Sequence, residues 1–200
     1  MQYPTISEYV KASQDASDNL DMSTKATEEE RKEALVDEWG VKYSKDGRKL
    51  LKAPQKLDST YSIKEGVKII CDSAFFGCFS LTGIVIPSSV TSIGNGAFMH
   101  CSSLTSLVIP DSVTSIGDSA FGYCCSLTDI VIPDGVTSIG DGAFKSCSSL
   151  SRLVIPNGVT SIGDNAFRGC SSLSSLVIPD YVVNIKGNPF SGWNGELKCL

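Results

Sequence analysis

A Gly, an Asp and two Ser lie close together in the stretch VTSIGDSAF, from Val113 to Phe121. Residues of these types at this spacing could form a phosphate-binding loop or the turn that carries a nucleophile. The stretch lacks the G-K-[ST] ending and the preceding buried strand of a phosphate loop. Nearly the same string also begins at Val67, Val90, Val136 and Val159. A string that recurs at a constant interval indicates a structural repeat rather than a single catalytic site.

The acidic residues of these strings suggest a second chemistry, because they align in one column: Asp72, Asn95, Asp118, Asp141 and Asp164. A calcium site needs about six to eight oxygen ligands, which single carboxylates in a row do not supply. One copy is also an Asn. We therefore expect each of these residues to cap a helix of one turn, with the neighbouring glycine allowing a sharp bend.

The eight Cys offer a third chemistry, either disulfides or metal binding. Five of them occupy one slot of the repeat: Cys78, Cys101, Cys124, Cys147 and Cys170. Five equivalent residues cannot all pair with one another, so we expect buried, reduced thiols. No C-x-x-C spacing occurs, and the single His, His100, falls in a slot of variable residues that predicts a surface position. We expect no zinc site and no other cofactor.

The elements that position these residues follow from the period of 23. In SLTSLVIP, from Ser103 to Pro110, apolar residues alternate with others, which is typical of a short strand with one buried face. The proline ends the strand and a turn follows. VTSI is a second extended piece, and the Ala and Phe after it complete an apolar edge. One unit cannot bury this edge alone, whereas stacked units share a core. The pattern predicts an α+β repeat solenoid.

The aligned unit, L-x-x-L-x-I-P-x-x-V-x-x-I-G-x-x-A-F-x-x-C, resembles the BspA-like leucine-rich repeat family over residues 61 to about 190. The resemblance implies a right-handed coil of short parallel β-strands and one-turn helices. It also implies a bacterial origin and, as in some members, adhesion to host matrix proteins.

Two flanking regions depart from the repeat. Residues 1–60 predict a cap of helices and a β-hairpin, and residues 61–200 predict the solenoid, with five regular repeats from about 67. Thr5 with Glu8, and Thr27 with Glu30, have the spacing of capping boxes, and the second helix should run past Leu35 and Trp39 to Gly40. The hairpin should turn at Asp46–Gly47 and form a charged, exposed edge. Residues 181–200 predict a degenerate capping repeat.

Composition narrows the classes of function. The net charge is −5 and no basic stripe is present, which argues against nucleic-acid binding. No apolar run reaches the ~18 residues that span a bilayer, so we expect no membrane insertion. The N-terminal residues lack the pattern of a signal peptide, which together with reduced Cys favours the cytoplasm, while the resemblance allows the cell surface. We expect a monomer.

No Ser/His/Asp set, paired carboxylates or dinucleotide fingerprint is evident, so we expect no enzyme. The outward positions of the repeated strand form three columns that could bind a protein ligand. They contain Val85, Val108, Val131, Val154 and Val177; Gly83, Ser106, Asp129, Arg152 and Ser175; and Thr82, Thr105, Thr128, Ser151 and Ser174. The alternative, which the residues leave open, is that Val simply suits a sheet surface.

Three functions fit these features. The first is a non-enzymatic protein-interaction scaffold that binds through this strand surface, centred near Val131. The second is a cell-surface adhesin for host matrix proteins, which requires export. The third is an intracellular regulatory module that acts through its N-terminal cap.

Overall fold

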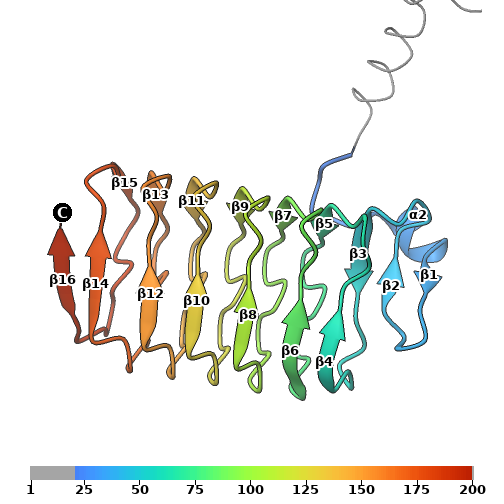
Figure 1. Cartoon of the computed structure of the whole chain (residues 1–200), viewed down its shortest axis with the longest axis horizontal. Helices are drawn as coiled ribbons and strands as arrows, with labels where there is room; N and C mark the ends of the chain where they lie inside the picture. Colours follow the sequence, from blue (N-terminus) through green and yellow to red (C-terminus); the bar gives the residue numbers. More distant parts are fainter. Residues whose placement is uncertain (1–20, 200) are drawn as a thin grey trace, which may run out of the picture.

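Each repeat forms one coil with two short strands, and the coils stack along the long axis of the molecule (Figure 1). The structure is a computed structural model and describes residues 21–199. Equivalent strands of neighbouring coils pair in parallel, one repeat apart, for example Ile84 with Leu107 and Ser138 with Ser161. Stacked parallel pairing lets every coil but the terminal ones bury its apolar edge between two neighbours. The predicted parallel-strand solenoid is confirmed.

Two sets of strands run along the stack. A nine-stranded sheet contains β1 (Leu35–Val36), β2 (Lys42–Tyr43), β3 (Lys49–Lys52), β5 (Ile69–Ile70), β7 (Ser92–Ile93), β9 (Ser115–Ile116), β11 (Ser138–Ile139), β13 (Ser161–Ile162) and β15 (Asn184–Ile185). The other set contains β4 (Ser59–Ser62), β6 (Leu81–Val85), β8 (Ser106–Val108), β10 (Asp129–Val131) and β12 (Arg152–Val154), then β14 (Ser175–Ile178) with β16 (Glu196–Cys199). We call the outward side of this second set the front face.

The core is a series of ladders made of equivalent residues. Five phenylalanines stack with centroid distances from 5.0 Å at Phe75–Phe98 to 5.9 Å at Phe144–Phe167. The five equivalent cysteines are fully buried and free, as predicted. Four of these thiols donate to a phenylalanine carbonyl of the preceding coil, as from Cys124 Sγ to Phe98 O at 3.2 Å, and Cys78 donates to Pro54 O at 3.5 Å. The ladder thus places a weak donor where a buried carbonyl needs a partner.

The predicted one-turn helices are wrong, because residues 118–123 and their equivalents form successive tight turns. Alternate N–H groups leave the turn: those of Ser119 and Tyr123 donate to Asp141 O and Lys145 O of the next coil. Both residues adopt positive φ, +52° and +61°. A helix would require those N–H groups for its own bonds, so the inter-coil ladder excludes it.

The Asp column also differs from the prediction. The Oδ1 atom of Asp118 accepts the N–H of Asp141 in the next coil at 2.8 Å, and Asp141 accepts that of Asp164 at 2.9 Å. These residues therefore tie coils together rather than cap a helix. The preceding Gly117 does not have positive φ, so a sharp bend is not its role. A Cβ atom there would lie 2.6 Å from Asn95 Oδ1, which only glycine avoids.

Residues 21–60 contain far less helix than predicted. The capping box of Thr27 and Glu30 is confirmed, but its helix, α2 (Glu28–Lys32), ends after five residues. Leu35 instead pairs with Tyr43 in an antiparallel ladder, and Gly40 lies in a tight turn with its N–H on Asp37 O. Strand pairing has overridden local helix propensity. The capping box at Thr5 and Glu8 lies outside the described residues.

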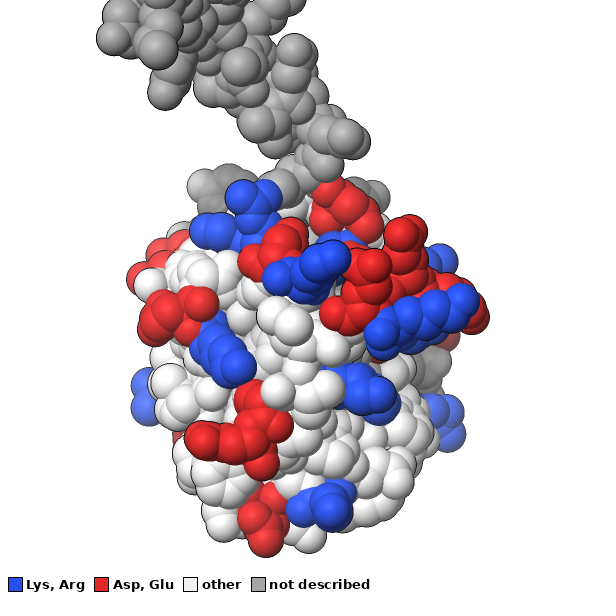
Figure 2. All heavy atoms as spheres, turned by 90° about the vertical axis from the view of Figure 1, so that its right-hand side faces the viewer, with Lys and Arg blue, Asp and Glu red and all other residues white. Residues whose placement is uncertain are grey.

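The hairpin of β2 and β3 is confirmed at Asp46–Gly47, but it is not the exposed edge. Strand β3 lies between β2 and β5, and β1 forms the outer edge. Lys49 is buried, with Nζ 2.6 Å from Asp21 Oδ2 and 3.0 Å from Glu30 Oε1. Basic and acidic side chains therefore alternate over this end of the molecule (Figure 2).

The last coil keeps part of the register, as expected of a degenerate repeat. Ile185 pairs with Ile162, and Phe190 stacks on Phe167 at 5.6 Å. Trp193, in the cysteine slot, donates its Nε1–H to Leu173 O at 2.6 Å.

Candidate protein-binding face

The front face exposes the valine column that the sequence predicts. In these strands the residues on either side of each valine point into the core, so the valine points outward. The exposed fraction runs from 39% at Val177 to 76% at Val108. In-register pairing aligns Val85 with Val108 and Val131 with Val154. The hydrogen-bonded ladder breaks between β12 and β14, so Val177 continues the column on a separate two-stranded sheet.

The neighbouring polar columns differ in what they can offer a ligand. Ser106, Asp129 and Arg152 are exposed and adjacent, because Asp129 pairs with both of the others. The hydroxyl of Thr105 donates to Thr82 O at 3.1 Å and that of Thr128 to Thr105 O at 3.3 Å. These threonines support the backbone of the preceding coil. The column of Gly83, Ser106, Asp129 and Arg152, which we call the varying column, is therefore a better candidate for specific contacts than the column that contains Thr105 and Thr128.

A hollow of about 530 Å³ lies on this face between β4 and β10. Its lining includes Gly83, where the next three coils carry Ser, Asp or Arg, and a Cβ atom on Gly83 would lie 2.9 Å from Thr60 Oγ1. The hollow includes Val85, Val108 and Val131. The predicted centre, Val131, lies at one end of the hollow, which extends from there toward the N-terminal end of the stack. Arg152, Val154, Ser175 and Val177 lie outside the hollow.

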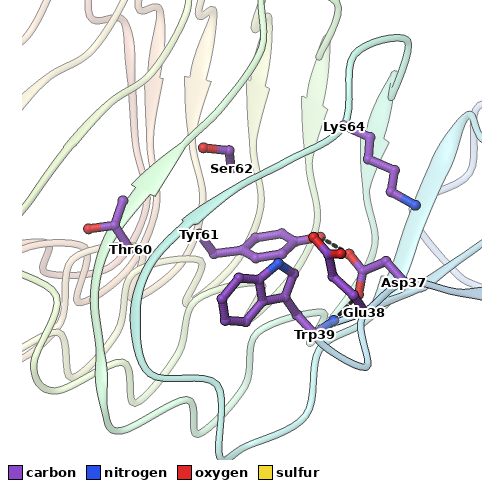
Figure 3. Close-up of a pocket in the computed structure, with 7 residues that line it drawn as sticks. All are labelled: Asp37, Glu38, Trp39, Thr60, Tyr61, Ser62 and Lys64. Carbon is purple, nitrogen blue, oxygen red and sulfur yellow. Dashed lines mark hydrogen bonds between the residues drawn. The ribbon is translucent and has the colours of Figure 1, made fainter.

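A second pocket of about 530 Å³ adjoins the N-terminal side of the first, and Thr60 lines both. Figure 3 shows the residues that line this pocket, among them Trp39, Tyr61 and Lys64. Trp39 is 55% exposed. The other lining residues are Asp37, Glu38 and Ser62. An exposed Trp beside carboxylates and hydroxyls is the type of residue that dominates binding energy at protein interfaces.

Hydrogen bonds hold the turn that carries Trp39. Asp37 Oδ1 accepts the N–H groups of Trp39 and Val41, at 3.0 and 2.8 Å. The Tyr61 hydroxyl donates to Asp37 Oδ2 at 2.5 Å and contacts the Tyr43 hydroxyl. Burial, together with the bond to Asp37, raises the pKa of Tyr61, so this hydroxyl stays protonated as a donor. These hydrogen bonds therefore hold the turn in place.

Other chemistries find little support in the described part of the chain. Residues 21–199 bring no three or more His, Cys, Asp or Glu side chains together to hold a metal ion. His100 is half-buried rather than fully exposed, stacked 4.6 Å from the ring of Tyr123. Its variable slot has positive φ in every regular coil, a constraint on the backbone that side-chain variety did not reveal.

Within residues 21–199, no helix has the length and apolar character that crossing a bilayer requires.

The coils, their parallel strands and the repeated Leu, Ile, Phe and Cys ladders define a leucine-rich repeat solenoid. The family of BspA type leucine rich repeat regions matches residues 68–195 in six copies. The chain belongs to this family. Leucine-rich repeat proteins are generally protein-interaction modules, and those of this family and its structural neighbours are non-enzymatic.

Solved structures show the same fold. A leucine-rich repeat protein from T. pallidum is 27% identical, with a TM-score of 0.62 over 87% of this chain and 86% of that one. A leucine-rich repeat protein from Eubacterium ventriosum is 24% identical, with a TM-score of 0.68 over 80% of this chain and 50% of that one. The pneumococcal vaccine antigen PcpA is 20% identical, with a TM-score of 0.65 over 84% of this chain and 48% of that one. This chain thus spans about half of the latter two. No curated protein matches it.

Two features of the face were missed from the sequence. The hollow includes Gly83, and the sequence signal for this position was the break in a column that otherwise carries side chains. Trp39 was assigned to a helix, so its place beside the front face was not foreseen. Thr60, which joins the two pockets, precedes the first recognisable repeat and had no signal.

Proposed function

We propose that the chain is a non-enzymatic scaffold that binds a segment of a partner protein along the front face. The observation that carries this proposal is one continuous surface: a row of exposed valines, a hollow at Gly83 and the Trp39 pocket, joined through Thr60. Apolar surface of this extent, rimmed by polar residues, is typical of a protein interface. The partner contacts the valines along the strands and the Trp39 indole at one end.

The varying column gives this surface a direction. Gly83, Ser106, Asp129 and Arg152 follow one another along the stack, from no side chain to a negative and then a positive charge. Complementary charges on a partner fix its register more than they add affinity. A bound segment therefore places a positive group over Asp129 and a negative group over Arg152.

The test compares three variants in pull-downs from the source cell, with bound proteins quantified by mass spectrometry. Val108→Lys with Val131→Lys places charge on the apolar row, and Trp39→Ala removes the indole. Val183→Lys is the matched control, because Val183 is equally exposed, at 74%, but lies beyond the front face. Exposed substitutions change stability by only about 0.5 kcal/mol each, so folding is preserved. The proposal expects the same proteins to be lost from the first two variants and kept by the control.

The Trp39 pocket also favours the second candidate, a regulatory module that acts through its N-terminal segment. In that case Trp39→Ala abolishes binding while the lysines at Val108 and Val131 leave it unchanged, and the repeats act as a spacer. Adhesion to host matrix proteins is the narrower form of the first candidate. It predicts that immobilised matrix proteins retain the chain and release the Val108→Lys, Val131→Lys variant. If partners bind all the variants equally, the front face is not the binding surface.

A further inference from the structure

The two long sheets differ in how the residues before the repeats extend them. In the nine-stranded sheet, β3, β2 and β1 continue the strand order beyond β5. The five-stranded sheet gains no strand in this way, because among the described strands β6 is the only hydrogen-bonded neighbour of β4. The other side of β4, which we call the β4 edge, lies instead at the pocket of about 530 Å³ that the turn of Asp37 to Trp39 also lines.

The backbone of β4 shows which groups belong to this edge. The N–H of Ile63 donates to Val85 O, next to β4 in the sheet, at 3.0 Å. Since successive residues of a strand direct their N–H and C=O groups to opposite sides, Tyr61 also faces β6, whereas Thr60 and Ser62 face away from it. Within residues 21–199, no backbone group pairs with Thr60 or Ser62 on that outer side. Such a row of N–H and C=O groups is a template for another strand.

The pocket beside the β4 edge suits an extended peptide. Strand β4 has four residues and spans about 13 Å, and three of the four line the pocket (Figure 3). The exposed indole of Trp39 offers apolar surface to a side chain of a strand added there. An added strand therefore finds backbone partners on β4 and an apolar contact at Trp39 in one pocket.

The charged side chains of the pocket favour a basic ligand. Lys64 Nζ lies 4.8 Å from the centroid of the Tyr43 ring, so this cation already has a partner. Asp37 accepts the N–H groups of its own turn and the Tyr61 hydroxyl. Glu38 is exposed, and in the described part of the chain no ion pair includes it. A basic side chain of a bound segment complements the charge of Glu38.

We propose that an extended segment of a partner protein, with an apolar and a basic side chain, adds to the β4 edge as a further strand of this sheet. Its backbone pairs with Thr60 and Ser62, its apolar side chain contacts Trp39 and its basic side chain pairs with Glu38. In this mode of recognition the main-chain hydrogen bonds provide affinity and the side-chain contacts provide specificity. The inference rests on the proposed function in that the ligand is a protein segment, but it does not require the valine row.

Amide hydrogen exchange of the intact chain, followed by nuclear magnetic resonance, tests the β4 edge without any ligand. We expect the amides of Tyr61 and Ile63 to be protected, because they face β6, and those of Thr60 and Ser62 to exchange freely. If Thr60 and Ser62 are protected in the protein alone, another part of the chain or a second copy already covers the edge, and the inference is wrong.

The probe for binding is a set of linear peptides selected by phage display on the native chain. Selected peptides should contain an apolar and a basic residue and should protect the amides of Thr60 and Ser62. In synthetic copies, N-methyl groups on alternate amides should abolish binding in one phase and leave it intact in the other, because only every second amide faces β4. A selection that yields no peptide with these properties overturns the inference.

Variants of the chain test the pairing itself. Ser62→Pro removes an N–H that faces outward, a position where an edge strand tolerates proline, and should weaken peptide binding at least about tenfold more than Ser62→Ala does. Trp39→Ala and Glu38→Lys, which leave the strand unchanged, should each weaken it about tenfold. Val183→Lys, which is remote from β4, should bind the peptide as the native chain does. Peptide binding that survives both Ser62→Pro and Glu38→Lys would show that the β4 edge is not the site.

The same samples keep this inference apart from the proposed function. The lysines at Val108 and Val131 decide whether the partner protein needs the valine row, whereas Ser62→Pro and the amide protection decide whether a strand adds to the β4 edge. Either result stands if the other fails.

Discussion

Substituting Gly140 by Ala tests why four of the five regular coils have glycine before their Asp or Asn, the first coil having Cys71 instead. A Cβ atom on Gly140 would lie 2.6 Å from the Asp118 N atom, 2.6 Å from the Gly117 carbonyl carbon and 2.7 Å from Asp118 Oδ1. These atoms belong to the preceding coil. Two of them are backbone, and Gly117 is itself held by its bond to Ile93 O at 2.9 Å. The coils must therefore separate locally to accept a methyl group.

The loss of folding free energy in Gly140→Ala has two parts. Forcing an extra carbon into a packed site costs about 1–3 kcal/mol. Displacing Asp118 also breaks its bond to the Asp141 N–H, and a hydrogen bond to a charged group contributes about 1.5–3 kcal/mol. Together we expect a loss of about 3–5 kcal/mol. For a chain of this size that corresponds to a thermal midpoint lower by roughly 10 °C.

The matched control is Gly135→Ala in the same coil. Its Cβ would lie no closer than 3.3 Å to another atom, Asp111 O, and Ser89 and Ser112 already occupy this slot in two coils. We expect a change within about 1 kcal/mol. Both variants are unfolded by heat and by urea, with circular dichroism as the signal. If Gly140→Ala and Gly135→Ala unfold at the same midpoint, contact with the Asp column is not the reason for the glycine.

Two further results are expected. Burial raises the pKa of Cys71, Cys124 and Cys170 to about 12. The unfolded thiols ionise near pH 9, so above that pH the unfolded state holds fewer protons than the folded state. The free energy of unfolding therefore falls between about pH 9 and 12, by up to about 1.4 kcal/mol per thiol per pH unit. Urea midpoints at pH 8 and pH 10 measure this, and equal midpoints would contradict it. Removing residues 1–60 takes away β3, which pairs with β5, and half of β4, which pairs with β6, and should cause aggregation in light scattering. A soluble, cooperatively unfolding product would instead show the predicted cap to be a separate appendage.

The sequence predicted the coil well because its side chains repeat. Each buried slot, such as Val113, Ile116, Phe121 and Cys124, recurs with the same residue type, so periodicity alone separates core from surface. The turn at Asp46–Gly47 was predictable for a similar reason, since it depends on local chemistry. The capping box at Thr27 was likewise local, and it formed.

Features that depend on neighbouring coils were not predictable in this way. Asp118 and Gly117 look like a helix cap and a bend when one unit is considered alone. Their roles appear only when Asp141 donates to one and Asn95 approaches the other. The same applies to Leu35, whose helical pattern gave way to pairing with Tyr43. Contacts between units compete with local conformational propensity. The sequence of one unit alone does not determine which of the two sets the conformation.

The front face combines both kinds of information, and this bears on how it would recognise a partner. Its valine column is constant because each coil meets the same neighbours, so the valines alone cannot distinguish one position along the stack from another. The column beside it changes from Gly83 to Arg152 with no effect on the strand register. Outward-facing residues that make no contact needed by the fold can vary without loss of stability. Under the proposed function, recognition on this face would divide between the two columns: the valines would supply apolar contact, and the varying column with Trp39 would determine where along the stack a ligand binds.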